Sequence, residues 1–190
     1  YGSEAYYREG LTLTLATNLS EQTGYHITYK ADDQIISSTY TVNRNDGDVT
    51  LSAVKENNTY TVQFNGNGGT PATIADIKQN YDTDITAPAD PTREGNTFVG
   101  WNPALPTTMP ADDMNVTAQW TPIDYTINYI LDGGSVDPAN PTSFTIETPT
   151  FTLTNPTKPG YTFTGWTGTG LTEITKTVVI EQGSTKHRSY

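Results

Sequence analysis

The sequence predicts a mainly β or α+β protein of small tandem modules, each a roughly four-stranded sheet with at most one short helix. Composition is the first reason: of 190 residues, 36 are Thr and 12 are Tyr, against 5 Phe and 2 Met. Such β-branched and aromatic side chains suit strands that are half solvated. Short segments also alternate between apolar and polar residues, as half-buried strands do. Finally, a repeat of 65 residues organises the chain.

Charge and residue content exclude several classes of function. With 21 acidic and 10 basic residues, the net charge is −11, which argues against binding nucleic acid or anionic lipid. The absence of cysteine excludes disulfides and thiolate metal sites, and two histidines leave little material for other metal chemistry. We therefore expect no metal, no cofactor, no nucleic acid partner and no direct insertion of this segment into a membrane.

The repeat is visible as one ungapped offset that keeps glycine, proline and tryptophan in step. Its strongest matches pair 60–64 (YTVQF) with 125–129 (YTINY), 68–69 (GG) with 133–134, 91–93 (PTR) with 156–158 (PTK), and 97–101 (TFVGW) with 162–166 (TFTGW). Chance composition rarely aligns these residue types together, so the two stretches are expected to share one fold.

Three modules follow from this offset, at residues 1–58, 60–121 and 125–190. Residues 48–53 match 113–118 at the same offset, whereas 24–27 resemble 160–163 six residues out of register. The first module is therefore read as a divergent copy with an insertion or, as the alternative, as a different small β domain.

The middle module shows how one copy is expected to fold. Alternation predicts a strand from Tyr60, a second strand between Ile74 and Ile85, a third at 98–101 and a fourth at 114–120. Residues 90–95 have an Asp, Pro and Gly at the cap positions of a single helical turn. Pleat alternation places Phe98 with Gly100 on one face and Val99 with Trp101 on the other.

The same parity predicts the buried face and two special glycines. Gly95 and Gly160 are expected to adopt positive φ at the end of a turn. Alternate positions on facing strands are expected to form the core, namely Tyr60, Val62, Phe64, Phe98, Val116, Ala118 and Trp120, with Tyr125, Ile127, Tyr129 and Phe163 in the next copy.

These residues carry a family resemblance. The series 60–64, 68–69, 91–95, 98–101 and 116–120 closely resembles the internalin B-repeat, also called the Listeria–Bacteroides repeat. Residues 125–190 resemble a second such repeat that lacks its final strand, and 1–58 resemble the divergent version, beginning where its second strand is expected. The resemblance implies β-grasp modules repeated in tandem in secreted or wall-attached bacterial surface proteins.

Trp101 and Trp166, each following a glycine, are the candidate binding residues. They could form an exposed aromatic platform for a sugar or protein, or pack within the module, and packing is favoured because repeated aromatics usually serve it. The acidic turns at 43–48 and 111–113 lack the alternating ligand spacing of a calcium loop. His26 and His187 lie in different modules, and no catalytic residues are predicted.

The function predicted is that of a non-catalytic segment of a bacterial surface protein, a spacer and protein-interaction scaffold in adhesion. The expected location is extracellular, with attachment to the cell surface through other parts of the protein. The expected partner is a host or bacterial surface protein or a glycan. One alternative is an adhesin module that binds host glycans or proteins through exposed aromatics. Another is a part of a surface enzyme whose catalytic domain lies elsewhere.

Overall fold

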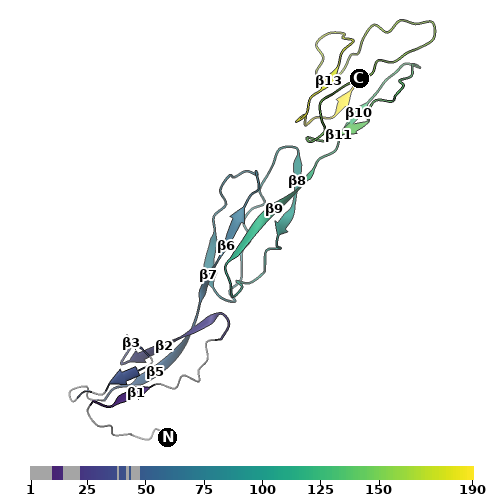
Figure 1. Cartoon of the computed structure of the whole chain (residues 1–190). Coiled ribbons are helices and arrows are strands. Elements are labelled where there is room, and N and C mark those ends of the chain that lie inside the picture. Colours follow the sequence, from purple (N-terminus) through teal and green to yellow (C-terminus); the bar gives the residue numbers. More distant parts are fainter. Residues whose placement is uncertain (1–9, 15–21, 38, 42, 44–47) are drawn as a thin grey trace. The chain divides into compact units, whose positions relative to one another are not determined.

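The computed structural model describes residues 10–14, 22–37, 39–41, 43 and 48–190 (Figure 1). Within these ranges the protein is all-β, with strands and no helix, arranged in several small sheets. Nor do they contain a helix long and apolar enough to cross a lipid bilayer. The predicted fold class of tandem small β modules is confirmed.

The described residues before Asn58 form two small sheets. Strand β1 (Thr12–Thr14) pairs antiparallel with β4 (Thr39–Thr41). A three-stranded antiparallel sheet has the order β3-β2-β5, with β2 at Tyr25–Ala31, β3 at Gln34–Ile36 and β5 at Leu51–Asn57. The β2–β5 ladder is unbroken, because its register runs from Tyr25 opposite Asn57 to Ala31 opposite Leu51.

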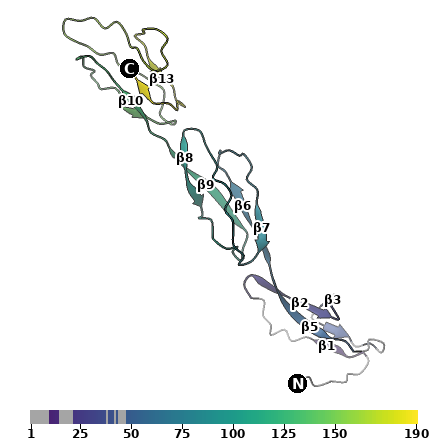
Figure 2. The ribbon, with the colours of Figure 1, turned by 180° about the vertical axis from the view of Figure 1, so that it is seen from behind.

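The middle copy contains a four-stranded sheet with the order β7-β6-β9-β8 (Figure 2). Its strands are β6 (Thr59–Asn65), β7 (Ile77–Asn80), β8 (Asn96–Asn102) and β9 (Met114–Pro122). The predicted core face is confirmed at Val62, Val116 and Ala118, each 0% exposed. Its larger aromatic members are half-buried: Tyr60, Phe64, Phe98 and Trp120.

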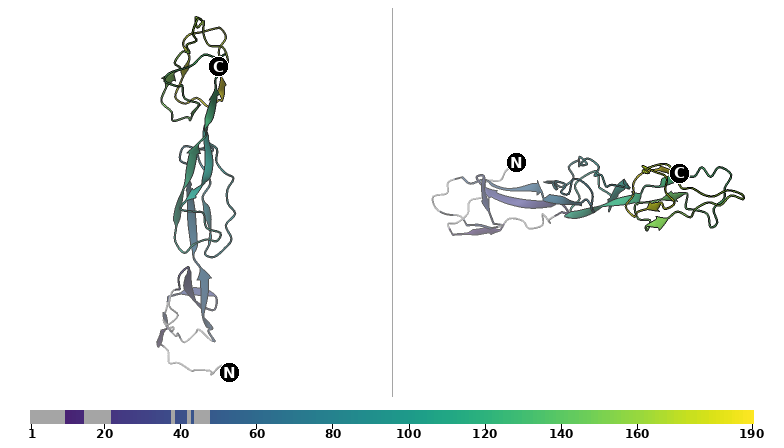
Figure 3. Two further views of the ribbon diagram at one scale, coloured as in Figure 1. Left: turned by 90° about the vertical axis from the view of Figure 1, so that its right-hand side faces the viewer. Right: turned by 90° about the horizontal axis from the view of Figure 1, so that it is seen from above.

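The third copy has shorter strands joined by longer connections (Figure 3). Strand β10 (Tyr125–Asn128) lies between antiparallel β11 (Ser143–Phe144) and parallel β14 (Arg188–Ser189), and β12 (Phe151–Thr152) pairs with β13 (Val179–Ile180). The buried cluster of this copy is Tyr125, Ile127, Phe144, Leu153, Trp166, Val178, Ile180 and Tyr190, against which Tyr129 and Phe163 pack half-buried.

The two copies share one framework, at the predicted offset for the strands that begin each copy and later than that offset for β14. Sheet order β7-β6-β9 in the middle copy corresponds to β11-β10-β14 in the third. The bridge between Thr70 and Thr92 recurs between Ser135 and Thr157, 65 residues later. The tight turn that follows the first strand also recurs, because Gly69 N–H donates to Gly66 O and Gly134 N–H donates to Leu131 O.

The helical turn expected at residues 90–95 is wrong. Thr92 exchanges two backbone hydrogen bonds with Thr70, at 2.7 and 2.9 Å, which holds this segment extended. A β-turn follows, closed by Asn96 N–H donating to Arg93 O. The expectation of positive φ is confirmed, at 67° for Gly95 and 79° for Gly160. The residues expected to cap a helix therefore form the turn between the Thr92 bridge and strand β8. A helix does not form because Thr92 makes its backbone hydrogen bonds with Thr70.

The predicted faces of β8 are also wrong, because the strand contains a β-bulge. Phe98 lies opposite Trp120 and Gly100 lies opposite Gln119, so Val99 is an extra residue that has no partner residue on β9. A bulge reverses the parity of every later residue in its strand. Trp101 therefore shares a face with Phe98, their ring centroids 5.3 Å apart, while Val99 is 60% exposed.

The bulge predicts unequal sensitivity at neighbouring positions. We expect Val99→Thr to change the free energy of unfolding by no more than about 0.5 kcal/mol, because the side chain is solvated. Trp101→Ala is expected to cost about 2 kcal/mol, below the range for a fully buried aromatic because the indole is only half-buried. Urea denaturation of both variants measures this, and equal losses would contradict the bulge.

By compactness the described chain divides into two units. The first holds the described residues of Tyr1–Gln63 with Ala75–Ala87 and Leu105–Val116, and the second holds Phe64–Ile74, Pro88–Ala104 and Thr117–Tyr190. Strands β6 and β9 contribute residues to both. The module boundaries given above therefore stay predictions.

Candidate functional site

Trp101, the first candidate binding residue, lies in an aromatic cluster of the middle copy. Its ring centroid is 5.0 Å from that of Phe64 and 5.3 Å from that of Phe98, both edge-on. Phe98 in turn meets Trp120 at 5.5 Å. Edge-to-face contacts of this kind stabilise packed aromatics. The indole is half-buried and serves packing, and a role in binding stays a prediction.

Trp166, the second candidate, is only 3% exposed. Its Nε1–H donates a 2.9 Å hydrogen bond to Asn155 Oδ1, which satisfies the polar atom of the indole. Phe163 and Tyr129 flank the ring at centroid distances of 5.4 and 6.0 Å. One edge of this cluster faces a groove, so Trp166 forms part of its floor.

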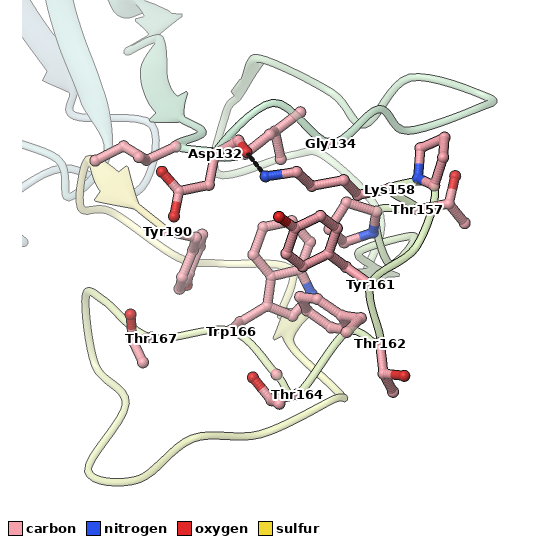
Figure 4. A pocket seen from close by; sticks show the side chains of 16 residues that line it. Asp132, Gly134, Thr157, Lys158, Tyr161, Thr162, Thr164, Trp166, Thr167 and Tyr190 are labelled. Carbon is pink, nitrogen blue, oxygen red and sulfur yellow. Dashed lines mark hydrogen bonds between the residues drawn. The ribbon is translucent and has the colours of Figure 1, made fainter.

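The groove lies in the third copy and has a volume of about 890 Å³. Figure 4 shows Tyr161, Trp166 and Tyr190 around it, with Lys158 Nζ donating to the Asp132 carbonyl at 2.7 Å. The same ammonium lies 4.3 Å from the centre of the Tyr161 ring, which is 71% exposed. Its lining is mixed, with threonine side chains beside the aromatic rings. Residue types alone did not indicate this groove, because its lining comes from segments that are distant in sequence, such as Asp132, Lys158 and Tyr190.

Acidic side chains serve turns rather than a metal centre in the part of the chain that the structure describes. Asp113 Oδ1 accepts the Thr61 N–H at 2.8 Å, and Asp32 Oδ1 accepts the Thr50 N–H at 2.8 Å. No group of three or more His, Asp or Glu side chains is placed to hold a cation there. Of the acidic turn predicted at 43–48, residues 44–47 lie outside the described residues.

A charged cluster lies near the first junction. Glu56 accepts a 2.7 Å hydrogen bond from Thr28 Oγ1 and lies 3.3 Å from His26 Nε2. The Thr28 hydrogen bond, followed by the charges of His26 and Lys30, lowers the pKa of Glu56. The second imidazole nitrogen of His26 lies 2.6 Å from Asn58 Oδ1. His26 therefore links β2 to the junction residue, and among the described residues its partners are Glu56 and Asn58.

The junctions between copies contain the same hydrogen bond twice. Asn58 N–H donates to Gly24 O at 2.8 Å, and Ile123 N–H donates to Gly95 O at 2.9 Å. The two donors are 65 residues apart, and the acceptors are the two turn glycines, with φ of 81° and 67°. Gly24 and Gly95 are 71 residues apart, so the six-residue shift noted in the sequence lies after Gly24, in the connection between β2 and β5, and these two strands still meet as β8 and β9 do.

Each turn glycine also meets the same position of the following copy. The Gly24 backbone lies against the Tyr81 ring, and the Gly95 backbone lies against Ile146, which is 65 residues after Tyr81. A Cβ on Gly95 would be 2.7 Å from Ile146 Cδ1. These recurring contacts, with the two hydrogen bonds above, are called the joint contacts below. Residue spacing had not revealed them, because each connects two copies.

Further bonds strengthen each set of joint contacts. At the first, Tyr25 meets Tyr81 edge-on at 5.2 Å, and Asn57 Nδ2 donates to Tyr81 O at 3.0 Å. At the second, Thr185 Oγ1 donates to Glu94 Oε1 at 3.3 Å. The side chains differ, whereas the glycine and the backbone bond are retained.

Comparison with known protein families decides the identity of the repeats. The model of the Listeria-Bacteroides repeat domain matches residues 60–119 and again residues 125–184, which together are more than half of the chain. The chain belongs to the Listeria–Bacteroides repeat family. The resemblance inferred from the sequence is thereby confirmed for the second and third copies. This family consists of repeat modules rather than catalytic domains.

Two similar proteins are much longer than the chain. A protein of Evansella cellulosilytica named "Putative membrane protein" is 32% identical over 130 residues, which are 62% of this chain and 18% of that protein. Internalin H of Listeria monocytogenes is 37% identical over 91 residues, which are 43% of this chain and 16% of internalin H. The chain thus spans less than a fifth of either relative. No solved structure matches the chain.

Within the last Listeria–Bacteroides repeat, one tyrosine gives stability a pH dependence. Burial raises the pKa of Tyr129 to about 12, with a smaller contribution from Tyr190, and its hydroxyl donates to Pro141 O at 2.8 Å. An unfolded tyrosine titrates near 10. Stability from neutral Tyr129 is therefore complete below about pH 10 and lost as pH rises toward 12.

We expect the melting temperature to fall across that interval, and Tyr129→Phe to remove most of the fall because phenylalanine cannot ionise. Circular dichroism melts between pH 9 and 12 measure this. An identical fall in the variant would contradict the assignment.

Proposed function

We propose that the chain is a non-catalytic spacer and interaction scaffold within a bacterial cell-surface protein. Its repeats belong to a family typical of bacterial surface proteins, and its relatives include internalin H and an Evansella membrane protein. The tandem copies hold another part of the protein away from the cell envelope and contribute to adhesion. The location is extracellular, with attachment through other parts of the parent protein.

The recurrence of the joint contacts is the observation that carries this proposal. A flexible tether needs no specific bonds between its modules, and the distance between its ends varies widely. Here a turn glycine and a backbone hydrogen bond join consecutive copies in the same way twice. A repeated nearest-neighbour interface is how solenoid and array proteins obtain stiffness. A stiff array keeps the distance between its two ends nearly constant, as a spacer must.

Surface composition is consistent with an exposed location. The chain carries a net charge of −11. Excess negative charge keeps a protein soluble and opposes self-association. The described residues contain no buried charged side chain, so their charges lie at the surface. Such an array resists non-specific adhesion, so that only particular surfaces of it bind a partner.

Electron spin resonance distances test the spacer directly. Because the chain has no cysteine, spin labels can be attached to pairs of introduced cysteines at the exposed positions Ile35, Val99 and Ile174. We expect a single narrow distance distribution for Ile35 with Val99 and another for Val99 with Ile174. Distributions as broad as those of a Gly/Ser linker of equal length would overturn the spacer.

A matched pair of variants connects that result to the joint contacts. Gly95→Ala places a methyl group against Ile146, whereas Gly160→Ala places one where no atom lies within 4 Å. Both glycines have positive φ, so both variants carry the same backbone strain. We expect only Gly95→Ala to broaden the distribution between Val99 and Ile174. Equal broadening in both variants would show that the joint contacts do not hold the copies.

A further inference from the structure

The turn that follows β6 contains two asparagine–glycine dipeptides, Asn65-Gly66 and Asn67-Gly68, and the sequence contains no others. In such a dipeptide the backbone nitrogen of the glycine can attack the side-chain amide of the asparagine. Glycine favours this attack because it has no Cβ to obstruct the approach and its backbone rotates freely. The turn therefore holds the same reactive pair twice, in two different surroundings.

The side chain of Asn65 is exposed and its amide carbon is activated. Asn65 Oδ1 accepts the Asn67 N–H at 2.9 Å, which forms an Asx turn. A hydrogen bond to a carbonyl oxygen stabilises the oxyanion that forms when a nucleophile adds to the carbon. Among the described residues, neither Asn65 Nδ2 nor Gly66 N–H has a hydrogen-bond partner. The leaving amine and the attacking nitrogen are therefore both free to move.

Asn67 is followed by the same residue type but is held in place. Its Nδ2 donates a 3.1 Å hydrogen bond to the carbonyl oxygen of Ala118, a fully buried residue of β9. Its backbone has a φ of 48°, the left-handed conformation of a turn. Attack by Gly68 N requires the amide to leave Ala118, so the hydrogen bond opposes the reaction at Asn67.

The space around Gly66 permits its nitrogen to move toward Asn65 Cγ. The nearest atoms to a Cβ placed on Gly66 would be Ile74 Cδ1 and Pro71 O, both at 3.7 Å, which is ordinary contact. A Cβ on Gly69, in the same turn, would instead be 2.7 Å from the Trp120 ring. The part of the turn that must rotate for the attack is thus the more loosely packed part.

We propose that Asn65 is a site of spontaneous deamidation, a covalent modification that needs water and no enzyme. Gly66 N gives its proton to solvent and forms a bond to Asn65 Cγ. The Cγ–Nδ2 bond breaks and ammonia leaves, which gives a five-membered succinimide. Water then opens the ring: cleavage of the new N–Cγ bond gives aspartate, and cleavage between the nitrogen and the backbone carbonyl carbon gives isoaspartate. The net reaction adds water and releases ammonia.

The two products affect the turn differently. Aspartate keeps a side-chain oxygen that accepts the Asn67 N–H, so the Asx turn is retained. Isoaspartate adds one carbon atom to the main chain and displaces the Gly66 carbonyl, which accepts Gly69 N–H at 2.9 Å and Trp120 Nε1–H at 3.3 Å. The isoaspartate form is therefore expected to lower the melting temperature of the middle copy, whereas the aspartate form is not.

The test is incubation of the full 190-residue chain in neutral buffer, with and without urea, followed by peptide mapping. Electron-transfer fragmentation locates each deamidated asparagine and distinguishes aspartate from isoaspartate. In the folded chain we expect Asn65 to react about tenfold faster than Asn67, the factor that one hydrogen bond supplies. In urea, where both surroundings are lost, the two rates are expected to be similar. Equal rates in the folded chain, or an intact Asn65 there while it reacts fully in urea, would overturn the proposal.

Two variants check the chemistry. Gly66→Ala adds a methyl group in ordinary contact, at a glycine without positive φ, so the fold is expected to be retained. We expect Asn65 to deamidate at least about tenfold more slowly in this variant, because Cβ obstructs the attacking nitrogen. Asn65→Asp supplies the aspartate product alone and is expected to keep the initial melting temperature. An unchanged rate in Gly66→Ala would contradict attack by the Gly66 nitrogen.

Discussion

Replacing Trp166 by alanine is expected to unfold the third copy near room temperature. The indole is 3% exposed, bonded to Asn155 and surrounded by Phe163, Tyr129 and Tyr190. Truncating a buried aromatic side chain costs about 3–5 kcal/mol. This is close to the whole stability of a small domain, and this copy buries its core beneath an open groove.

The matched control for this variant is Tyr161→Ala. Tyr161 lines the same groove but is 71% exposed, so its removal is expected to change the free energy of unfolding by less than about 1 kcal/mol. Urea denaturation followed by Trp fluorescence and amide NMR separates the two. If Trp166→Ala keeps the wild-type midpoint but loses retention on a host ligand, then the indole is a binding residue and the packing role assigned to it is wrong.

The second large effect is expected for Gly24→Ala at the first set of joint contacts. Gly24 has φ of 81°, a conformation that costs alanine about 1 kcal/mol. Its Cβ would also overlap the Tyr81 ring near its attachment to the chain, where the ring cannot swing away without leaving Tyr25. Overpacking of this kind costs about 1–3 kcal/mol more.

The Gly24→Ala substitution is expected to destabilise the junction between the first two copies as well as the core of the first. Because Gly24 O accepts the Asn58 N–H, a displaced turn breaks a bond between β2 and the start of the middle copy. Amide exchange at Asn58 and Tyr81 is expected to accelerate in Gly24→Ala more than it does at β2. Gly160 also has a positive φ but has open space around it, so Gly160→Ala measures the free-energy cost of the backbone strain alone. Equal stability of the two variants would contradict the joint contacts.

The repeat could be predicted from sequence because its offset is ungapped where the copies match. Tyr60 and Tyr125 occupy equivalent places in two sheets, and Thr92 and Thr157 form equivalent isolated bridges, as expected from the sequence. Positive φ at Gly95 and Gly160 followed from residue type and position. These features are local, or repeat as a block, so composition and spacing reveal them.

Two predictions failed because pairing outweighs local preference. Asp90 and Pro91 suit a helical start, yet two hydrogen bonds to Thr70 hold Thr92 extended. Strict alternation separated Phe98 from Trp101, yet the bulge at Val99 returns them to one face. Bulges and long-range bridges depend on the partner strand, which is distant in sequence.

The candidate site shows a similar division. Tryptophan at 101 and 166 was recognised, and packing was favoured over binding. The groove beside Trp166 could not be predicted, because its lining residues, such as Asp132, Lys158 and Tyr190, are distant in sequence. The joint contacts needed coordinates, because Gly24 with Tyr81 and Gly95 with Ile146 connect different copies. Gly24 is followed by Tyr25 whereas Gly95 is followed by Asn96, so no shared local motif marks these contacts in the sequence.

Small-angle X-ray scattering of the 190-residue chain tests most directly whether the copies form a spacer. A single compact globule of this length has a radius of gyration of roughly 16 Å, whereas three small modules in series give about twice that value. The spacer account predicts a value near about 30 Å that does not change between low and moderate salt. A radius of gyration near the compact value would show the copies packed into one globule, and would contradict the proposed function.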